Sequence, residues 1–221
     1  MPRIARIIAP GIPHHVTQRG NRRMETFFQD EDYQAYLALM SEWCLKCNVA
    51  IWAYCLMPNH IHLIAVPEAE EGLRLAIGEA HRRYSAMINR RQKWTGHLWQ
   101  GRFSSFPMDE SYLLAAVKYI EMNPVRAQLA PDPYAWPWSS AKAHAAGQDD
   151  ILVSVAPLLE VVGEWRRFLT DVDDADAHKI RGHERTGRAL GEDSFLDSLE
   201  ISLQRPLKPK KAGRRRLISD K

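Results

Sequence analysis

The stretch Leu56-Met57-Pro58-Asn59-His60-Ile61-His62-Leu63 is the most informative part of this 221-residue chain for predicting its fold. It joins two apolar runs, residues 49–57 and residues 60–66, and Pro-Asn is typical of a tight turn. We therefore expect two strands that pair as a hairpin. Because side chains alternate between the faces of a strand, His60 and His62 should point the same way, and the apolar residues between and after them should face the opposite side.

The hairpin is one part of a longer order of predicted elements. Periodicity and turn residues predict a strand at 14–19, a helix beginning at Asp30, a helix beginning near Gly72, a strand at 98–106 and a third helix beginning at Asp109. Strand, helix, strand, strand, helix, strand is the order of the ferredoxin-like split βαβ fold, in the α+β class. Such a fold has a four-stranded antiparallel sheet with two helices on one face, which leaves the other face free for a site.

Composition narrows the cellular setting. The chain has neither an apolar run of membrane-spanning length nor a secretory leader, so we expect no membrane partner and a cytoplasmic location. Three cysteines cannot form a disulfide framework, which is typical of a reducing compartment. Cys44 and Cys47 form a C-x-x-C inside an amphipathic helical pattern, and without a second pair they are expected to be apolar packing residues.

The small net charge of +3 hides a strong segregation of charge. Residues 1–148 carry 16 basic and 13 acidic residues, residues 149–204 carry 6 and 13, and residues 205–221 carry 8 and 1. We predict a main domain at 1–148, a small accessory unit at 149–204 with helices near 155–169 and 193–203, and a disordered basic tail at 205–221. The tail could grip a polyanion, lie on the acidic unit and cover the site, or merely aid solubility.

Several basic residues are candidate contacts for nucleic acid. In the second helix the arginines lie off the apolar stripe, and we expect them to lack matching acids, which favours nucleic acid over an ordinary solvated face. The candidates are Arg19, Arg22 and Arg23 around one loop, Arg82 and Arg83 on the second helix, Arg102 in a strand with aromatic residues, and Lys210, Lys211, Arg214, Arg215 and Arg216 in the tail.

The third helix supplies the remaining chemistry. Tyr119 and Asn123 are four residues apart and therefore neighbours on one helical face, and Pro124 should end or bend the helix there. Together with His60 and His62 they form a mixed nitrogen and oxygen set that suits Mg²⁺ or Mn²⁺ better than a closed zinc site. A metal there could polarise a phosphate while Tyr119 attacks it.

Two alternatives accompany this assignment. Tyr119 could be an ordinary tyrosine, and Tyr112, which lies on the same helical stripe, would then be the next candidate nucleophile. His14 and His15 are expected to be strand residues with no metal role.

Three motifs resemble one family closely. They are Leu-Met-Pro-Asn-His-Ile-His-Leu at 56–63, Gly-His-Leu-Trp-Gln-Gly-Arg-Phe at 96–103 and Tyr-Ile-Glu-Met-Asn-Pro-Val-Arg-Ala at 119–127. Together they resemble the HUH-type single-tyrosine transposases, and above all the REP-associated tyrosine transposases of bacteria.

The resemblance implies a role for each matching position. His60 and His62 would be the paired metal ligands, and Asn123 would be the third ligand, where the insertion-sequence branch of the family usually has Gln. Tyr119 would form a 5′-phosphotyrosine bond with single-stranded or hairpin DNA. The resemblance leaves open whether the protein acts as a monomer or a homodimer, and whether Tyr119 serves its own histidines or those of a partner.

Two other functions compete with strand transfer. A DNA-binding regulator could use the same fold with an inert centre, although such a protein has no need of Tyr119 at this spacing. A metallohydrolase with an H-x-H-x-D-H arrangement is disfavoured, because Leu63, Ile64 and Ala65 follow His62.

Overall fold

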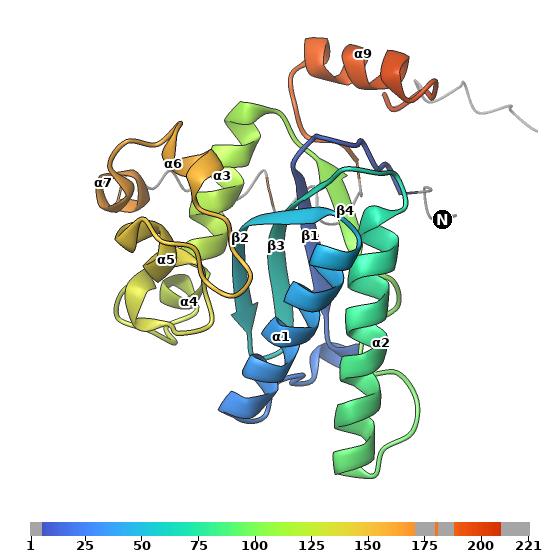
Figure 1. The fold of residues 1–221 in the computed structure, drawn as a ribbon, viewed down its shortest axis with the longest axis vertical. Helices are drawn as coiled ribbons and strands as arrows, with labels where there is room; N and C mark the ends of the chain where they lie inside the picture. The colour runs from blue at the N-terminus through green and yellow to red at the C-terminus, as the bar shows by residue number, and fades with distance from the viewer. Residues whose placement is uncertain (1–5, 171–179, 181–187, 209–221) are drawn as a thin grey trace, which may run out of the picture.

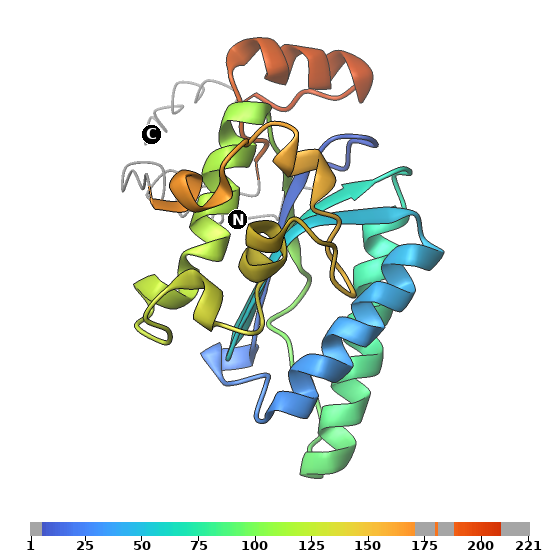
Figure 2. The ribbon, with the colours of Figure 1, turned by 60° about the vertical axis from the view of Figure 1, so that its left-hand side comes forward.

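A computed structural model describes residues 6–170, 180 and 188–208 of the chain. Its centre is a four-stranded antiparallel sheet in the order β2-β3-β1-β4. The strands are β1 (His14–Arg19), β2 (Val49–Met57), β3 (His60–Pro67) and β4 (Ser104–Pro107). Helices α1 (Asp30–Lys46) and α2 (Gly72–Gln92) cover one face, and α3 (Glu110–Glu121) lies against the other (Figures 1 and 2). The chain therefore has the expected ferredoxin-like split βαβ fold, in the α+β class.

The register of the sheet determines which side chains share a face. Arg19 of β1 pairs with His60 of β3, and Thr17 pairs with His62. Directly opposed residues in an antiparallel pair lie on the same face, so alternate residues of β1 join the two histidines on the side of α3. The apolar residues Ile61 and Leu63 pack with α1 and α2 instead. The alternation expected around the two histidines is therefore present.

The predicted strand at 98–106 is only partly correct. Its final part belongs to β4, whereas residues 98–103 form an irregular loop in which a single bridge joins Gly20 to Trp99. Gly101 has a φ of +72°, a left-handed conformation that turns the chain out of a strand. The loop nevertheless buries the side chains that suggested a strand, namely Leu98, Trp99 and Phe103.

The predicted helix at 155–169 is two short helices, α6 (Ala156–Leu159) and α7 (Trp165–Thr170), with Gly163 between them. The side chains of Leu158 and Trp165 pack with residues of β2 and α3 in one buried cluster. These residues are therefore docked on the sheet, as an accessory unit with little core of its own must be. The boundary at residue 148 stays a prediction.

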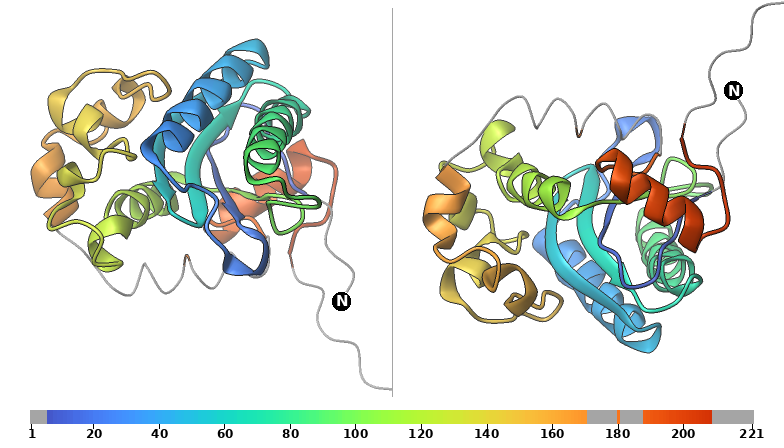
Figure 3. Two further views of the ribbon diagram at one scale, coloured as in Figure 1. Left: turned by 90° about the horizontal axis from the view of Figure 1, so that it is seen from below. Right: turned by 90° about the horizontal axis from the view of Figure 1, so that it is seen from above.

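Helix α9 (Asp193–Ser202) matches the expected helix near 193–203 and packs through Leu199 on the N-terminal segment around Ile7 and Ala9. It lies at the end of the sheet where β1 begins (Figure 3), whereas His60 begins β3 at the other end. Lys208 Nζ forms an ion pair with Asp197 Oδ1 of α9 at 2.6 Å, so the last described residue is held on this helix. None of the described helices is long and apolar enough to cross a membrane.

A buried carboxyl group joins three segments on the face of the sheet that α3 covers. Glu121, the last residue of α3, is fully buried. It accepts hydrogen bonds from Ser140 Oγ at 2.6 Å, His144 Nδ1 at 2.7 Å and Trp165 Nε1 at 2.9 Å. Ser140 precedes α5 (Ala141–Ala146), which contains His144, and Trp165 begins α7. One side chain thus ties α3 to α5 and α7.

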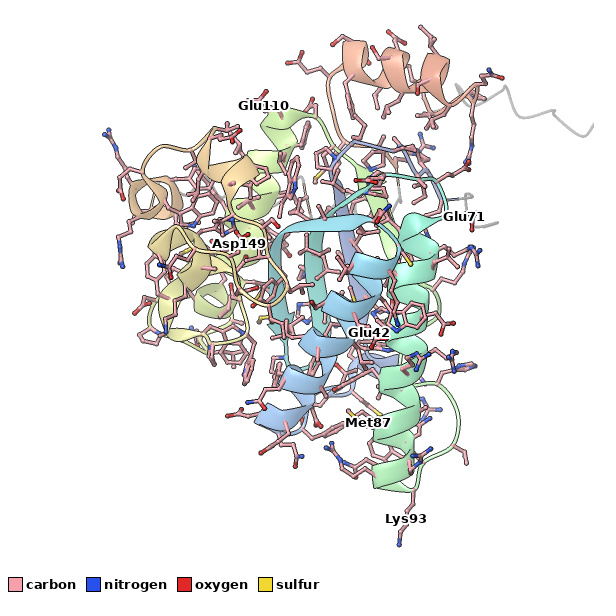
Figure 4. All side chains as sticks on the ribbon, in the orientation of Figure 1. Glu42, Glu71, Met87, Lys93, Glu110 and Asp149 are labelled. Atoms are coloured by element: carbon pink, nitrogen blue, oxygen red, sulfur yellow. The ribbon has the colours of Figure 1, made fainter. Side chains whose placement is uncertain are left out.

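We predict that Glu121→Ala destabilises the protein by about 3–5 kcal/mol, because three buried donors lose their acceptor. Urea unfolding followed by circular dichroism measures this. The control is Glu42→Ala, since Glu42 lies on the exposed face of α1 (Figure 4) and pairs only with Lys46 among the described residues. The control should leave stability nearly unchanged. Equal effects of the two substitutions would contradict the role given to Glu121.

The lowered pKa values of two core histidines imply that the free energy of unfolding depends on pH. Burial lowers the pKa of His14 to about 4 and the pKa of His81 to about 3. The unfolded chain binds protons at these residues near pH 6.5, so stability should fall as the pH drops below that value, by about 1.4 kcal/mol per pH unit for each histidine. Urea unfolding at several pH values measures the slope. His81→Gln should make it shallower, and an unchanged slope would refute the prediction.

Candidate functional site

The structure brings three of the four predicted site residues into one cluster. His60 and His62 of β3 have ring centroids 5.1 Å apart. The ring of Tyr119, from the last turns of α3, lies 5.6 Å from the ring of His62. His62 and Tyr119 are both buried, with 1% and 7% of their surface exposed. A strand and a helix on the same side of the sheet thus place the phenol beside the imidazoles.

Asn123 lies one turn beyond Tyr119. Helix α3 ends at Glu121, but Met122 keeps a right-handed helical backbone, and α4 (Asn123–Arg126) follows at once. Pro124 occupies the first turn of α4, where its missing N–H costs nothing, so it marks a junction between helices. The amide Nδ2 of Asn123 is buried and has no hydrogen-bond partner among the described residues.

Burial keeps both site histidines neutral. It lowers the pKa of His60 to about 3, with a further contribution from the charge of Arg19. The pKa of His62 lies well below its usual value, first because of burial and then because of nearby positive charge, including that of Arg126. Neutral imidazole is the form that binds a metal. The environment therefore favours ligation at ordinary pH.

The turn between β2 and β3 determines which nitrogen of His60 is available. The Nδ1 of His60 lies 2.6 Å from Asn59 Oδ1, and Asn59 Nδ2 donates to the carbonyl oxygen of Arg23 at 2.9 Å. A carbonyl oxygen can only accept, so the amide of Asn59 must direct its own oxygen towards His60. His60 Nδ1 then carries the proton, and its Nε2 keeps a lone pair.

Sequence reasoning missed His15. The sequence predicts a strand residue with no metal role, and the structure adds a contact with a candidate ligand: His15 Nε2 lies 2.9 Å from His62 Nδ1, with the two rings stacked at a centroid distance of 5.2 Å. His15 precedes by two residues Thr17, the direct partner of His62, so it is the diagonal neighbour on the same face. Only the register between β1 and β3 reveals this, and no local pattern contains it.

Arg126 was also missed. Its guanidinium carbon lies 4.3 Å from the centroid of the Tyr119 ring, and its Nη2 donates to the Tyr119 carbonyl oxygen. A cation over an aromatic face is attracted by the ring quadrupole. The sequence did contain a signal, because Arg126 follows Tyr119 by seven residues, which is almost two full helical turns.

The donors of this cluster fit a divalent metal. His60 presents its Nε2, and His62, whose Nδ1 faces His15, has only its Nε2 left to bind a metal. The third donor would be the side-chain amide oxygen of Asn123, one helical turn beyond Tyr119. The described residues contain no group of three His, Cys, Asp or Glu side chains arranged for a metal. Imidazole and amide donors suit Mg²⁺ or Mn²⁺ with water completing the shell.

The predicted DNA contacts do not all lie at this cluster. Arg19 of β1 lies directly opposite His60 of β3 in the strand register. Arg22 and Arg23 are exposed in the neighbouring turn, where Asn59 bonds the carbonyl oxygen of Arg23, and both have positive φ. Arg102 is exposed in the loop before β4. The tail candidates Lys210, Lys211, Arg214, Arg215 and Arg216 lie outside the described residues.

The expectation that the arginines of α2 lack acidic partners is wrong for Arg74, Arg82, Arg83 and Arg91. Arg82 and Arg83 lie in the helical layer, across the sheet from Tyr119, and both approach Glu79, at 2.7 Å and 3.8 Å. Arg74 pairs with Glu71 at the start of the helix, and Arg91 pairs with the buried Asp32 of α1. The partners of Arg74, Arg82 and Arg83 lie three or four residues earlier on the same helix, a spacing at which side chains meet.

Comparisons with solved structures found proteins of similar fold. The chain matches a structure described as the REP-associated tyrosine transposase bound to a REP hairpin, with 22% identity and a TM-score of 0.58, over 70% of this chain and 92% of that one. A candidate transposase from Deinococcus radiodurans R1 matches with 16% identity and a TM-score of 0.38, over 57% of this chain and 92% of that one. No protein of curated function matches significantly.

Residues 11–123 match the family of IS200-like transposases. The matched region runs from the turn before β1 to the first residue of α4, so it contains the sheet, α1 to α3 and all four predicted site residues. The chain belongs to the IS200-like transposase family.

Proposed function

We propose that this protein is a metal-dependent endonuclease and strand transferase for single-stranded DNA, which acts through a 5′-phosphotyrosine at Tyr119 on hairpin-forming repeats. The observation that carries the proposal is the position of the Tyr119 ring, 5.6 Å from His62 and 4.3 Å from the Arg126 guanidinium carbon. Membership of the transposase family and a fold shared with a protein bound to a REP hairpin support it.

The covalent step exchanges one phosphodiester for another. The phenol oxygen of Tyr119 attacks the phosphorus, and the bond from phosphorus to the 3′ oxygen breaks. The phenol proton leaves to water, and the departing 3′ oxygen takes up a proton to give a 3′ hydroxyl. The new bond between tyrosine and the 5′ phosphate keeps the energy of the original ester, so a second 3′ hydroxyl can reverse the step and rejoin strands.

The chain's own residues hold the reacting groups. His60, His62 and Asn123 would bind Mg²⁺ or Mn²⁺, which when bound supplies Lewis-acid polarisation of a phosphate oxygen. Arg126 lies over the ring of Tyr119 and bonds its carbonyl oxygen, so it restricts the orientation of the nucleophile and adds positive charge for a phosphate. Tyr119 and His62 approach within one chain, so we infer that a monomer can form a complete site. A homodimer remains compatible with this.

The DNA would approach along the end of the sheet where β3 begins. Arg19, Arg22 and Arg23 surround the turn at Asn59, and phosphate contacts there would lie next to His60. Arg102, the tail residues 210–216 and the paired Arg82 and Arg83 stay predicted contacts. A protein with these contacts would act in the cytoplasm, in association with DNA.

We predict that Tyr119→Phe abolishes cleavage and the covalent adduct, because it removes only the attacking oxygen. Binding of hairpin DNA should change little. A denaturing gel with a labelled oligonucleotide detects the adduct, and a mobility shift measures binding. Tyr112→Phe, on the same helix, is the matched control and should still form the adduct. An adduct with Tyr119→Phe would assign the nucleophile to another residue. Hairpin binding by the wild-type protein with no adduct would favour the non-catalytic regulator.

We also predict that a chelator stops cleavage and that Mg²⁺ or Mn²⁺ restores it. His60→Ala should lower the cleavage rate by about three orders of magnitude or more, because a Lewis acid contributes several kcal/mol at the transition state. His97→Ala, at an exposed position before β4, is the control and should cleave normally. Full activity in excess chelator would exclude the metal assignment.

A further inference from the structure

Two adjacent buried histidines of β1 have different surroundings. His14 is satisfied by backbone groups, because its Nε2 accepts from Ala9 N at 3.1 Å and its Nδ1 donates to the Ile12 carbonyl oxygen at 2.7 Å. His15 is equally buried. Among the described residues its only hydrogen bond joins its Nε2 to His62 Nδ1, and its Nδ1 has no partner.

The fold alone gives no reason for a histidine at position 15. A buried polar group without a partner destabilises the folded state, and Phe106 and the Tyr119 ring form an aromatic surrounding in which an apolar side chain would also pack. The polar contact that His15 does make is to a candidate metal ligand. This points to a role in the site.

The hydrogen bond between the two rings must have a direction. A neutral imidazole carries one proton, so when one ring donates the other accepts. If His15 donated, the proton of His62 would lie on its Nε2 and that nitrogen could not bind a metal. If His62 donates from Nδ1, its Nε2 keeps the lone pair.

We propose that His15 is a positioning residue whose Nε2 accepts a hydrogen bond from Nδ1–H of His62 and thereby presents the Nε2 lone pair of His62 to the metal. Asn59 does the same for His60 through its amide oxygen. This inference depends on the proposed metal centre. Partners that orient ligating histidines in this way fix the tautomer and the ring, and their loss typically weakens metal binding by about 10–100-fold.

The first test reads the tautomers directly in the metal-free full-length chain. Long-range proton–nitrogen NMR spectra of protein with ¹⁵N-labelled histidine report which ring nitrogen carries the proton. We expect both His60 and His62 to be protonated at Nδ1. A proton on Nε2 of His62 would overturn the proposal, and this readout does not require that the metal centre be correct.

The second test measures Mn²⁺ affinity by calorimetry or electron paramagnetic resonance. His15→Leu should weaken binding by about 10–100-fold. His15→Gln should bind within a few-fold of wild type, because its side-chain oxygen can accept near the position of Nε2. The matched control His14→Gln should lower the unfolding midpoint and leave affinity unchanged, and unfolding midpoints of all variants separate loss of fold from loss of metal.

The outcomes distinguish the two proposals. Wild-type protein that binds no Mn²⁺ would refute the metal centre of the proposed function, while the tautomer of His62 would still decide the direction of the hydrogen bond. Wild-type protein that binds Mn²⁺ together with an equally tight His15→Leu variant would refute the role of His15 alone.

Discussion

The candidate site depends on the buried carboxyl group of Glu121, because its hydrogen bonds fasten the last turn of α3, the helix that carries Tyr119. The three hydrogen bonds come from Ser140, His144 and Trp165. Ser140 Oγ also accepts from Tyr54 N in β2, and the backbone N–H of Ser140 donates to the Tyr54 carbonyl oxygen. The last turn of α3 is thereby fastened to the edge strand of the sheet. Tyr119 lies two residues before Glu121, so its ring is held against His62 by contacts on the opposite side of the helix.

This arrangement gives the residues after 139 a structural role in placing Tyr119 beside His62. The donors to Glu121 belong to α5, α7 and the residue before α5, which are far in sequence from the hairpin that contains His60 and His62. Trp165 stacks on His144 at a centroid distance of 4.0 Å, so the network excludes water as well as satisfying the carboxyl group. A buried polar network of this kind specifies one arrangement, because each alternative leaves a donor or acceptor unpaired.

The electrostatics of the cluster combine neutral ligands with fixed positive charge. Burial keeps His60 and His62 unprotonated, and the guanidinium groups of Arg19 and Arg126 lie nearby. Neutral nitrogen donors leave a divalent ion with its full charge, and the guanidinium groups add to it. The result is a site suited to an anionic substrate such as a phosphodiester.

Sequence patterns that span a few neighbouring residues were enough to predict the helices, strands and turns that depend on local periodicity. The hairpin of residues 49–66, the order of strands and helices and the shared helical face of Tyr119 and Asn123 follow from periods of two and of 3.6 residues and from turn residues. Tertiary structure decided the rest. The contact of His15 with His62 requires the register between β1 and β3, the loop at 98–103 buries apolar residues without forming a strand, and Arg91 of α2 pairs with Asp32 of α1. Each involves residues distant in the chain, or a choice between strand and loop that packing makes, so no local pattern could specify it.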